Sequence, residues 1–67
     1  MKKILVVDDD QTFRELVVAS ADQKKYIIST ASDGVEGLAS VMKSAPDAIL
    51  LDITMPRMNG VEFLEKL

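Results

Sequence analysis

Four aspartates in this sequence stand where they can share a divalent cation. Three of them, 8–10, follow the apolar run 4–7, and Asp52 follows the apolar run 48–51. Carboxylates that lie within a few ångström of one another repel, so a folded site protonates them, pairs them or shares a cation among them. The chain has no His and no Cys, which disfavours zinc. An all-oxygen set with open positions suits Mg²⁺ or Mn²⁺, and a phosphoryl group can enter such a site by bridging to the metal.

The segments before these aspartates are typical of strands in a parallel sheet. Residues 4–7 and 48–51 are short, unbroken apolar runs that end abruptly in charge, as strands buried on both faces do. Residues 26–30 form a further β-rich segment after a polar bend. We therefore expect three strands.

Three amphipathic helices are expected between and after these strands. Asp10 or Gln11 is placed to cap the first helix, and Asp33 and Glu36 have capping-box spacing for the second. Gly37 weakens the second helix. The second helix stops at Pro46, and Asn59-Gly60 closes the loop before the third. The apolar positions at helical spacing are Phe13, Leu16, Val17, Ser20 and Ala21 in the first helix, Val35, Leu38, Ala39 and Met42 in the second, and Val61, Phe63, Leu64 and Leu67 in the third.

This order of elements, βαβαβα, predicts an α/β fold with three parallel strands in the order 2-1-3. Right-handed crossovers place the first helix on one face of the sheet and the other two helices on the opposite face. The carboxyl ends of the first and third strands then lie side by side at the topological switch point, where open α/β sheets bind ligands. Asp8, Asp9, Asp10 and Asp52 converge there.

Length and charge exclude several classes of protein. The 67 residues, 48% of them apolar and with a formal charge of −3, make one small globular domain. The lysines are scattered in pairs such as Lys24-Lys25, so we expect no nucleic-acid binding. No segment approaches a membrane span, and the run 4–7 does not resemble a signal peptide because it stops at three aspartates. We expect a cytoplasmic protein without membrane contact.

Three strings together resemble the receiver domain of bacterial two-component response regulators, which has a CheY-like, flavodoxin-like fold. The strings are ILVVDDD at 4–10, ASDGVE at 31–36 and PDAILLDITMPRMNG at 46–60. One string alone is weak evidence, but three in this order and spacing are highly specific. The resemblance covers the whole chain.

The resemblance implies a phosphorelay function without turnover by this chain. Asp52 is then the phosphoacceptor, phosphorylated by a sensor histidine kinase or by a small phosphodonor. Mg²⁺, with Mn²⁺ as a substitute, is bound by Asp9, Asp52 and the backbone carbonyl of Thr54, while Asp8 holds it through water. Pro56 then fixes the turn after the site, and Gly60 begins the third helix.

The chain departs from the family in length. A complete receiver has five strands and five helices, so residues 1–67 resemble its first half. The Ser or Thr of strand four and the Lys of strand five, which contact the phosphoryl group in the family, are absent, so we expect impaired phosphorylation. The edge of strand 48–51 is then unpaired and apolar, which predicts a homodimer.

Other interpretations of the aspartates stay open at this point. Asp8, Asp9 and Asp10 can simply cap a helix and solvate a strand end. Asp8-x-Asp10-x-Thr12 also resembles the first motif of haloacid-dehalogenase-type phosphohydrolases, although Gln11 stands where that family usually has Gly. A third interpretation is a self-associating structural module with an idle acidic site.

Overall fold

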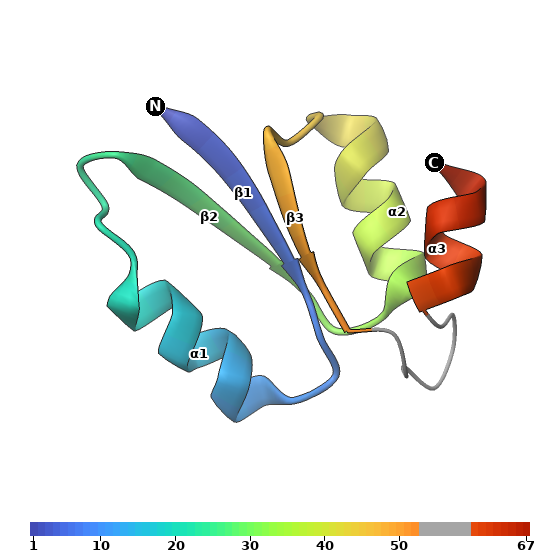
Figure 1. Cartoon of the computed structure of the whole chain (residues 1–67), viewed down its shortest axis with the longest axis horizontal. Helices are drawn as coiled ribbons and strands as arrows, with labels where there is room; N and C mark the ends of the chain where they lie inside the picture. The colour runs from blue at the N-terminus through green and yellow to red at the C-terminus, as the bar shows by residue number, and fades with distance from the viewer. Residues whose placement is uncertain (53–59) are drawn as a thin grey trace.

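The computed structural model describes residues 1–52 and 60–67 and has the expected alternation of strands and helices (Figure 1). Within that part of the chain no helix is long and apolar enough to cross a membrane. The elements are β1 (Lys2–Val7), α1 (Gln11–Ser20), β2 (Tyr26–Ala31), α2 (Gly34–Lys43), β3 (Ala48–Leu51) and α3 (Gly60–Lys66).

The strands form a parallel sheet in the order β2-β1-β3, which confirms the predicted topology. β1 is central because its residues pair with β2 on one side and with β3 on the other. Val7, for example, lies opposite Ala31 in β2 and Leu51 in β3. Figure 1 shows α1 on one face of the sheet and α2 with α3 on the other, as right-handed crossovers require.

The hydrophobic core lies on the side of α2 and α3. Side chains alternate between the faces of a strand, so every second residue of β1 and β3 points to this side. Phe63 of α3 is fully buried there and covers the core on the side away from the sheet. The core consists of Leu5, Val7, Ala31 and Phe63, packed against the half-buried Leu38, Val41, Ile49 and Leu51.

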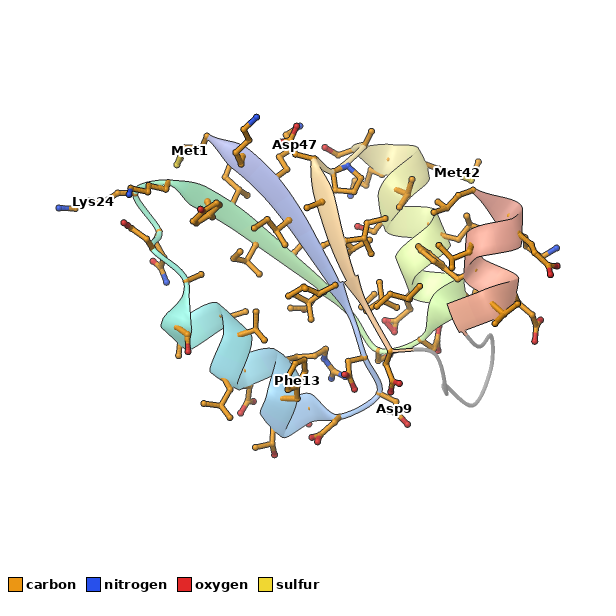
Figure 2. All side chains as sticks on the ribbon, viewed as in Figure 1. Met1, Asp9, Phe13, Lys24, Met42 and Asp47 are labelled. Atoms are coloured by element: carbon orange, nitrogen blue, oxygen red, sulfur yellow. The ribbon has the colours of Figure 1, made fainter. Side chains whose placement is uncertain are left out.

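The buried face of α2 differs from the predicted one. Val35 is 42% exposed and Met42 is 82% exposed, and Figure 2 shows Met42 at the outer side of the helix. The positions that face the sheet are Gly34, Gly37, Leu38 and Val41, a stripe at spacings of three and four residues. The prediction was wrong for Val35, Ala39 and Met42 because it assigned apolar residues to the buried face and treated Gly37 only as a residue that weakens the helix.

Gly37 is buried because α2 approaches the sheet and α3 closely at that residue. A Cβ atom there would lie 3.0 Å from Cε2 of Phe63 and 3.0 Å from Cγ2 of Val7. Both side chains are fully buried. Gly37 therefore lowers helix propensity but allows three elements to meet at the core.

The expected face of α1 points toward the sheet, but none of its residues is buried. A groove of about 660 Å³ separates this face from the sheet. Phe13 and Leu16 remain 43% and 59% exposed. The groove is lined on the helix side by Phe13, Leu16, Val17, Ser20 and Ala21, on the sheet side by Ile4, Tyr26, Ile28 and Leu50, and at the turn after α1 by Asp22.

Candidate functional site

Main-chain hydrogen bonds at the carboxyl end of the sheet bring two of the predicted aspartates together. The N–H of Asp8 donates to the carbonyl of Ala31 at 3.1 Å, and the N–H of Asp52 donates to the carbonyl of Val7 at 2.9 Å. The β1–β3 register, in which Val7 pairs with Leu51, therefore continues to Asp8 beside Asp52. The sheet itself fixes the spacing between these two residues.

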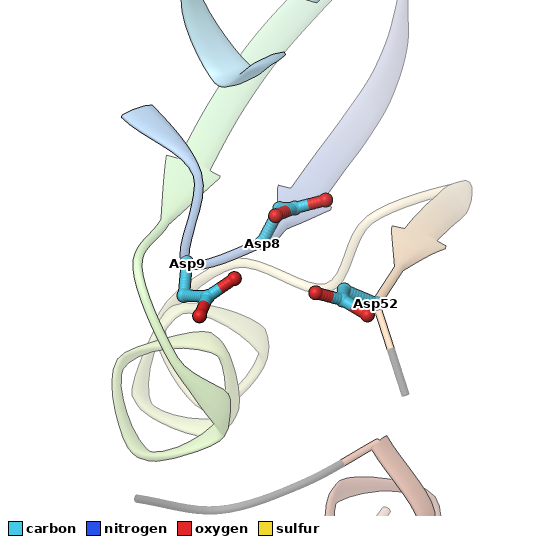
Figure 3. Close-up of side chains that lie close together, drawn as sticks. All are labelled: Asp8, Asp9 and Asp52. Atoms are coloured by element: carbon cyan, nitrogen blue, oxygen red, sulfur yellow. The ribbon is translucent and has the colours of Figure 1, made fainter. Parts of the chain in front are cut away.

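Three carboxylates form one cluster there: those of Asp8, Asp9 and Asp52. One oxygen from each lies within 4.8 Å of the others. Figure 3 shows the carboxylates of Asp9 and Asp52 pointing toward one another, with Asp8 at the end of β1 beside them. Asp8 and Asp52 are half-buried and Asp9 is exposed. Hard oxygen donors at this spacing fit a small divalent cation and leave positions for water or substrate.

Asp10 has a different role from its three neighbours. Its carboxylate accepts hydrogen bonds from the N–H groups of Thr12 at 3.0 Å and Phe13 at 3.3 Å, so it caps α1. Its own N–H donates to Oδ1 of Asp8 at 2.9 Å. The capping interpretation is therefore correct for Asp10. This turn also leads the chain from the site into α1.

Arg14 is a residue at this site that the sequence analysis missed. It lies one turn into α1, is half-buried, and its Nη1 donates to the main-chain carbonyl of Asp8 at 2.5 Å. Side chains in a helix tilt toward its N-terminus, so an arginine one turn beyond a capping aspartate can reach the residues that precede the helix. That spacing was the available signal in the sequence.

A small hollow lies beside the cluster. It has a volume of about 210 Å³ and is lined by Asp8, Asp52, Phe13, Leu50 and Leu51. Because two of the residues that line it carry carboxylates, the hollow can take a small anion only if a cation offsets the negative charge.

The loop between β2 and α2 confirms the second predicted cap. The carboxylate of Asp33, which is buried, accepts from the N–H of Glu36 at 2.9 Å. The carboxylate of Glu36 in turn accepts from the hydroxyl of Ser32 at 2.5 Å. These contacts fix the start of α2. They give Asp33 and Glu36 a structural role as helix-capping residues.

The remaining predicted site residues follow Asp52 directly. Thr54, whose carbonyl is expected to bind the metal, and Pro56, which is expected to fix the turn, lie outside the described residues. Gly60 begins α3 as expected.

Comparison with known proteins identifies the family of this chain. A family model described as the response regulator receiver domain matches residues 4–67. The chain belongs to this family. It is 43% identical over 67 residues to a protein-glutamate methylesterase/protein-glutamine glutaminase of Rhizobium etli and covers 19% of that protein. It is also 43% identical over 65 residues to the response regulator MprA of Mycobacterium leprae, of which it covers 28%.

Solved structures agree with this assignment. The chemotaxis protein CheY4 of Vibrio cholerae matches 97% of the chain with a TM-score of 0.89 and 40% identity. The response regulator protein TrrA of Thermotoga maritima, solved in complex with Mg²⁺ and BeF, matches 98% with a TM-score of 0.88 and 39% identity. The chain covers 54% and 57% of these two chains, so it spans about half of each.

The match also bears on the alternative interpretations. It runs through the segment after Asp52 as well as the aspartates after β1, whereas the phosphohydrolase motif involves only residues 8–12. The comparisons support neither the phosphohydrolase interpretation nor that of a structural module with an idle acidic site.

Proposed function

We propose that this chain is the first half of a receiver and that Asp52 is its phosphoacceptor. The observation that carries this proposal is the convergence of three carboxylates from two strand ends, with oxygens within 4.8 Å of one another, in a chain that belongs to the receiver family. Asp52 lies at the wall of the hollow where a phosphoryl group can approach. Asp8 and Asp9 approach it from the carboxyl end of the neighbouring strand β1.

The reaction is a phosphoryl transfer to a carboxylate. An oxygen of Asp52 attacks the phosphorus of a phosphohistidine on a sensor histidine kinase, or of a small acyl phosphate such as acetyl phosphate. The new bond is the P–O bond of an aspartyl phosphate. The bond to the donor breaks, and its electron pair leaves with the imidazole, which takes up a proton, or with acetate. The main-chain hydrogen bond from Asp52 to Val7 holds Asp52 at the end of β3. The step transfers one phosphoryl group to the chain and is not followed by turnover.

Mg²⁺ fits the donors that surround Asp52. A bound divalent cation supplies charge neutralisation for the oxygens of the transferring group. Asp9 and Asp52 are the direct ligands in this proposal, with the Thr54 carbonyl as a third, and Asp8 contributes through water. The structure of TrrA with Mg²⁺ and BeF supports the choice of Mg²⁺. Mn²⁺ shares the preference for oxygen ligands and is the expected substitute.

The kinase partner and a cytoplasmic location are parts of the same proposal. Response regulators such as MprA are the named relatives of this chain.

Phosphorylation from acetyl phosphate tests the proposal. The intact chain is expected to gain one phosphoryl group, seen in its intact mass, only in the presence of Mg²⁺. Asp52→Asn is expected to abolish the gain. Asp22→Asn, an exposed aspartate in the turn after α1, is the matched control and should leave it unchanged. Equal labelling of Asp52→Asn and the parent chain would refute the assignment.

We further propose that the 67-residue chain associates as a homodimer through the free edge of β3. β3 pairs with β1 along one edge, and no strand in the described part of the chain pairs with its other edge. Leu50 in that strand is 49% exposed and borders the apolar groove under α1. Pairing two β3 edges about a two-fold axis satisfies the main-chain groups and covers apolar surface of both copies.

Sedimentation equilibrium tests the dimer. The parent is expected at twice the 7.4 kDa chain mass. Leu50→Lys, which puts a charge on the edge strand, is expected to sediment as a folded monomer. Met42→Lys adds the same charge at an outer position of α2 that is 82% exposed and should remain dimeric. A parent chain that sediments as a monomer with native circular dichroism would overturn this proposal.

A further inference from the structure

The loop between β1 and α1 carries two of the three clustered carboxylates, and one side chain from outside the loop holds its backbone. Arg14 reaches back six residues and donates from Nη1 to the carbonyl of Asp8 at 2.5 Å. Arg14 is half-buried, and the hydrogen bond is partly buried as well. A half-buried arginine that binds a main-chain carbonyl beside an acidic cluster needs an explanation beyond solubility.

The Asp8–Asp9 peptide plane is the link between Arg14 and the site. Its carbonyl belongs to Asp8 and its N–H to Asp9, and the group is rigid. Holding the carbonyl therefore fixes the direction in which the chain enters Asp9. On either side of this peptide, the N–H of Asp8 donates to the carbonyl of Ala31 at 3.1 Å and the N–H of Asp10 donates to Oδ1 of Asp8 at 2.9 Å.

The restraints are unequal in what they control. The bond to Ala31 extends the sheet and involves the N–H of Asp8, which precedes the Asp8–Asp9 peptide in the chain. The bond from Asp10 fixes one oxygen of the Asp8 carboxylate. The Arg14 bond acts on the peptide itself, and Asp9, the exposed member of the cluster, has the least packing to hold its side chain in place.

We propose that Arg14 is a positioning residue, which sets the Asp8–Asp9 peptide so that the Asp9 carboxylate faces Asp52 and the cluster is arranged for a cation before the cation binds. This inference rests on the proposed function of the cluster as a Mg²⁺ site. Pre-arrangement lowers the cost of ordering the ligands on binding. Groups that orient metal ligands through hydrogen bonds change metal affinity when they are removed.

The side-chain chemistry of arginine suits this role. Its planar guanidinium is always charged and presents fixed donors at the end of a long side chain. From the first turns of α1 it spans to a carbonyl that lies before the helix. Lysine keeps the charge but has a single rotatable ammonium, whereas methionine keeps much of the volume and has neither charge nor donor. These two replacements separate the hydrogen bond from simple packing.

Calorimetric titration with Mg²⁺ tests the proposal on the intact chain and its Arg14→Met and Arg14→Lys variants. We expect Arg14→Met to bind Mg²⁺ about 10-fold more weakly, the lower end of the effect of removing a group that orients a metal ligand. Arg14→Lys should recover part of the loss. The amide resonances of Asp9 and Asp10 should shift in Arg14→Met without metal, because the peptide plane is released. Phosphorylation of this variant should reach the parent rate at saturating Mg²⁺.

A matched variant separates positioning from stability. Val17→Ala removes apolar contact from the half-buried side of α1 without touching the loop, and it should lower the urea midpoint while leaving Mg²⁺ affinity unchanged. Equal Mg²⁺ affinity in the parent and Arg14→Met would overturn the role of Arg14 and leave the proposed function standing. Equal weakening by Val17→Ala and Arg14→Met would overturn it too. A parent chain that binds no Mg²⁺ would overturn both the inference and the proposed function.

Discussion

Replacing Gly37 by alanine tests whether close packing or helix propensity governs α2. Alanine is favoured over glycine inside a helix by about 1 kcal/mol, so the change stabilises the protein if the site has room. The new Cβ atom would lie 3.0 Å from Cε2 of Phe63 and 3.0 Å from Cγ2 of Val7. Real Cβ contacts are rarely so short. Phe63 and Val7 are both fully buried, so neither can move away without disturbing the core.

The packing cost is expected to exceed the propensity gain. Inserting a methyl group into a filled core costs about 1–3 kcal/mol, which leaves a net loss of about 1 kcal/mol. The core of a chain this short supplies only about 3–5 kcal/mol. With a urea dependence of about 1 kcal/mol per molar for a small protein, the unfolding midpoint should fall by about 1 M. Circular dichroism at fixed protein concentration measures it, because association makes stability concentration-dependent.

Two further variants identify the cause. Ala39→Gly, at an exposed position of the same helix, measures propensity alone and should lower stability by about 1 kcal/mol. Phe63→Leu removes the ring edge, so Gly37→Ala should cost less in that background, with a coupling of about 0.5–1 kcal/mol in the double-mutant cycle. A Gly37→Ala variant with a higher urea midpoint than the parent would refute the packing argument.

Three other predictions concern the loops around the site. Asp10→Ala should lower the free energy of unfolding by about 1 kcal/mol through loss of the α1 cap. It should leave the Mg²⁺ affinity within a factor of about two, because Asp10 is outside the cluster. Urea unfolding and calorimetry on one sample measure both quantities. Asp33→Ala should cost more than Asp10→Ala, about 2 kcal/mol, because Asp33 is buried; equal costs would contradict this ranking. Asp9→Asn should raise the urea midpoint in metal-free, low-salt buffer, because it removes like-charge repulsion from the cluster. The same change should weaken Mg²⁺ binding. A lowered midpoint would show that the carboxylates of the cluster do not destabilise the fold by repulsion.

Much of the fold was predictable because strong local patterns agreed with one another. The apolar runs 4–7 and 48–51 end at Asp8 and Asp52, so they mark strand ends, and the crossover rule then fixes the order of the strands. The buried face of α2 was not predictable from apolar positions. Gly37 faces the core because Phe63, 26 residues later in the chain, needs the space, and no local pattern carries that information.

The candidate site divides in the same way. The convergence of Asp8, Asp9 and Asp52 follows from topology alone, and the structure brings their oxygens within 4.8 Å of one another. The separate role of Asp10 as a cap, and the reach of Arg14 to the Asp8 carbonyl, depend on side-chain geometry in one turn. A sequence pattern shows that a polar residue is near a strand end but not which hydrogen bond it makes.

Broadening of amide NMR signals by Mn²⁺ tests the central claim that the three carboxylates form one shared cation site. We expect loss of signals centred on residues 8–10 and Asp52, reversed by excess Mg²⁺. Lys24 should be unaffected, because it lies at the opposite end of the sheet from Asp9 (Figure 2), about 20 Å away along a strand of six residues. Lys25 should be unaffected too, because its carbonyl accepts from the N–H of Lys2 at the start of β1. Broadening centred on other acidic residues, such as Glu62 and Glu65 of α3, or no broadening at all, would contradict it.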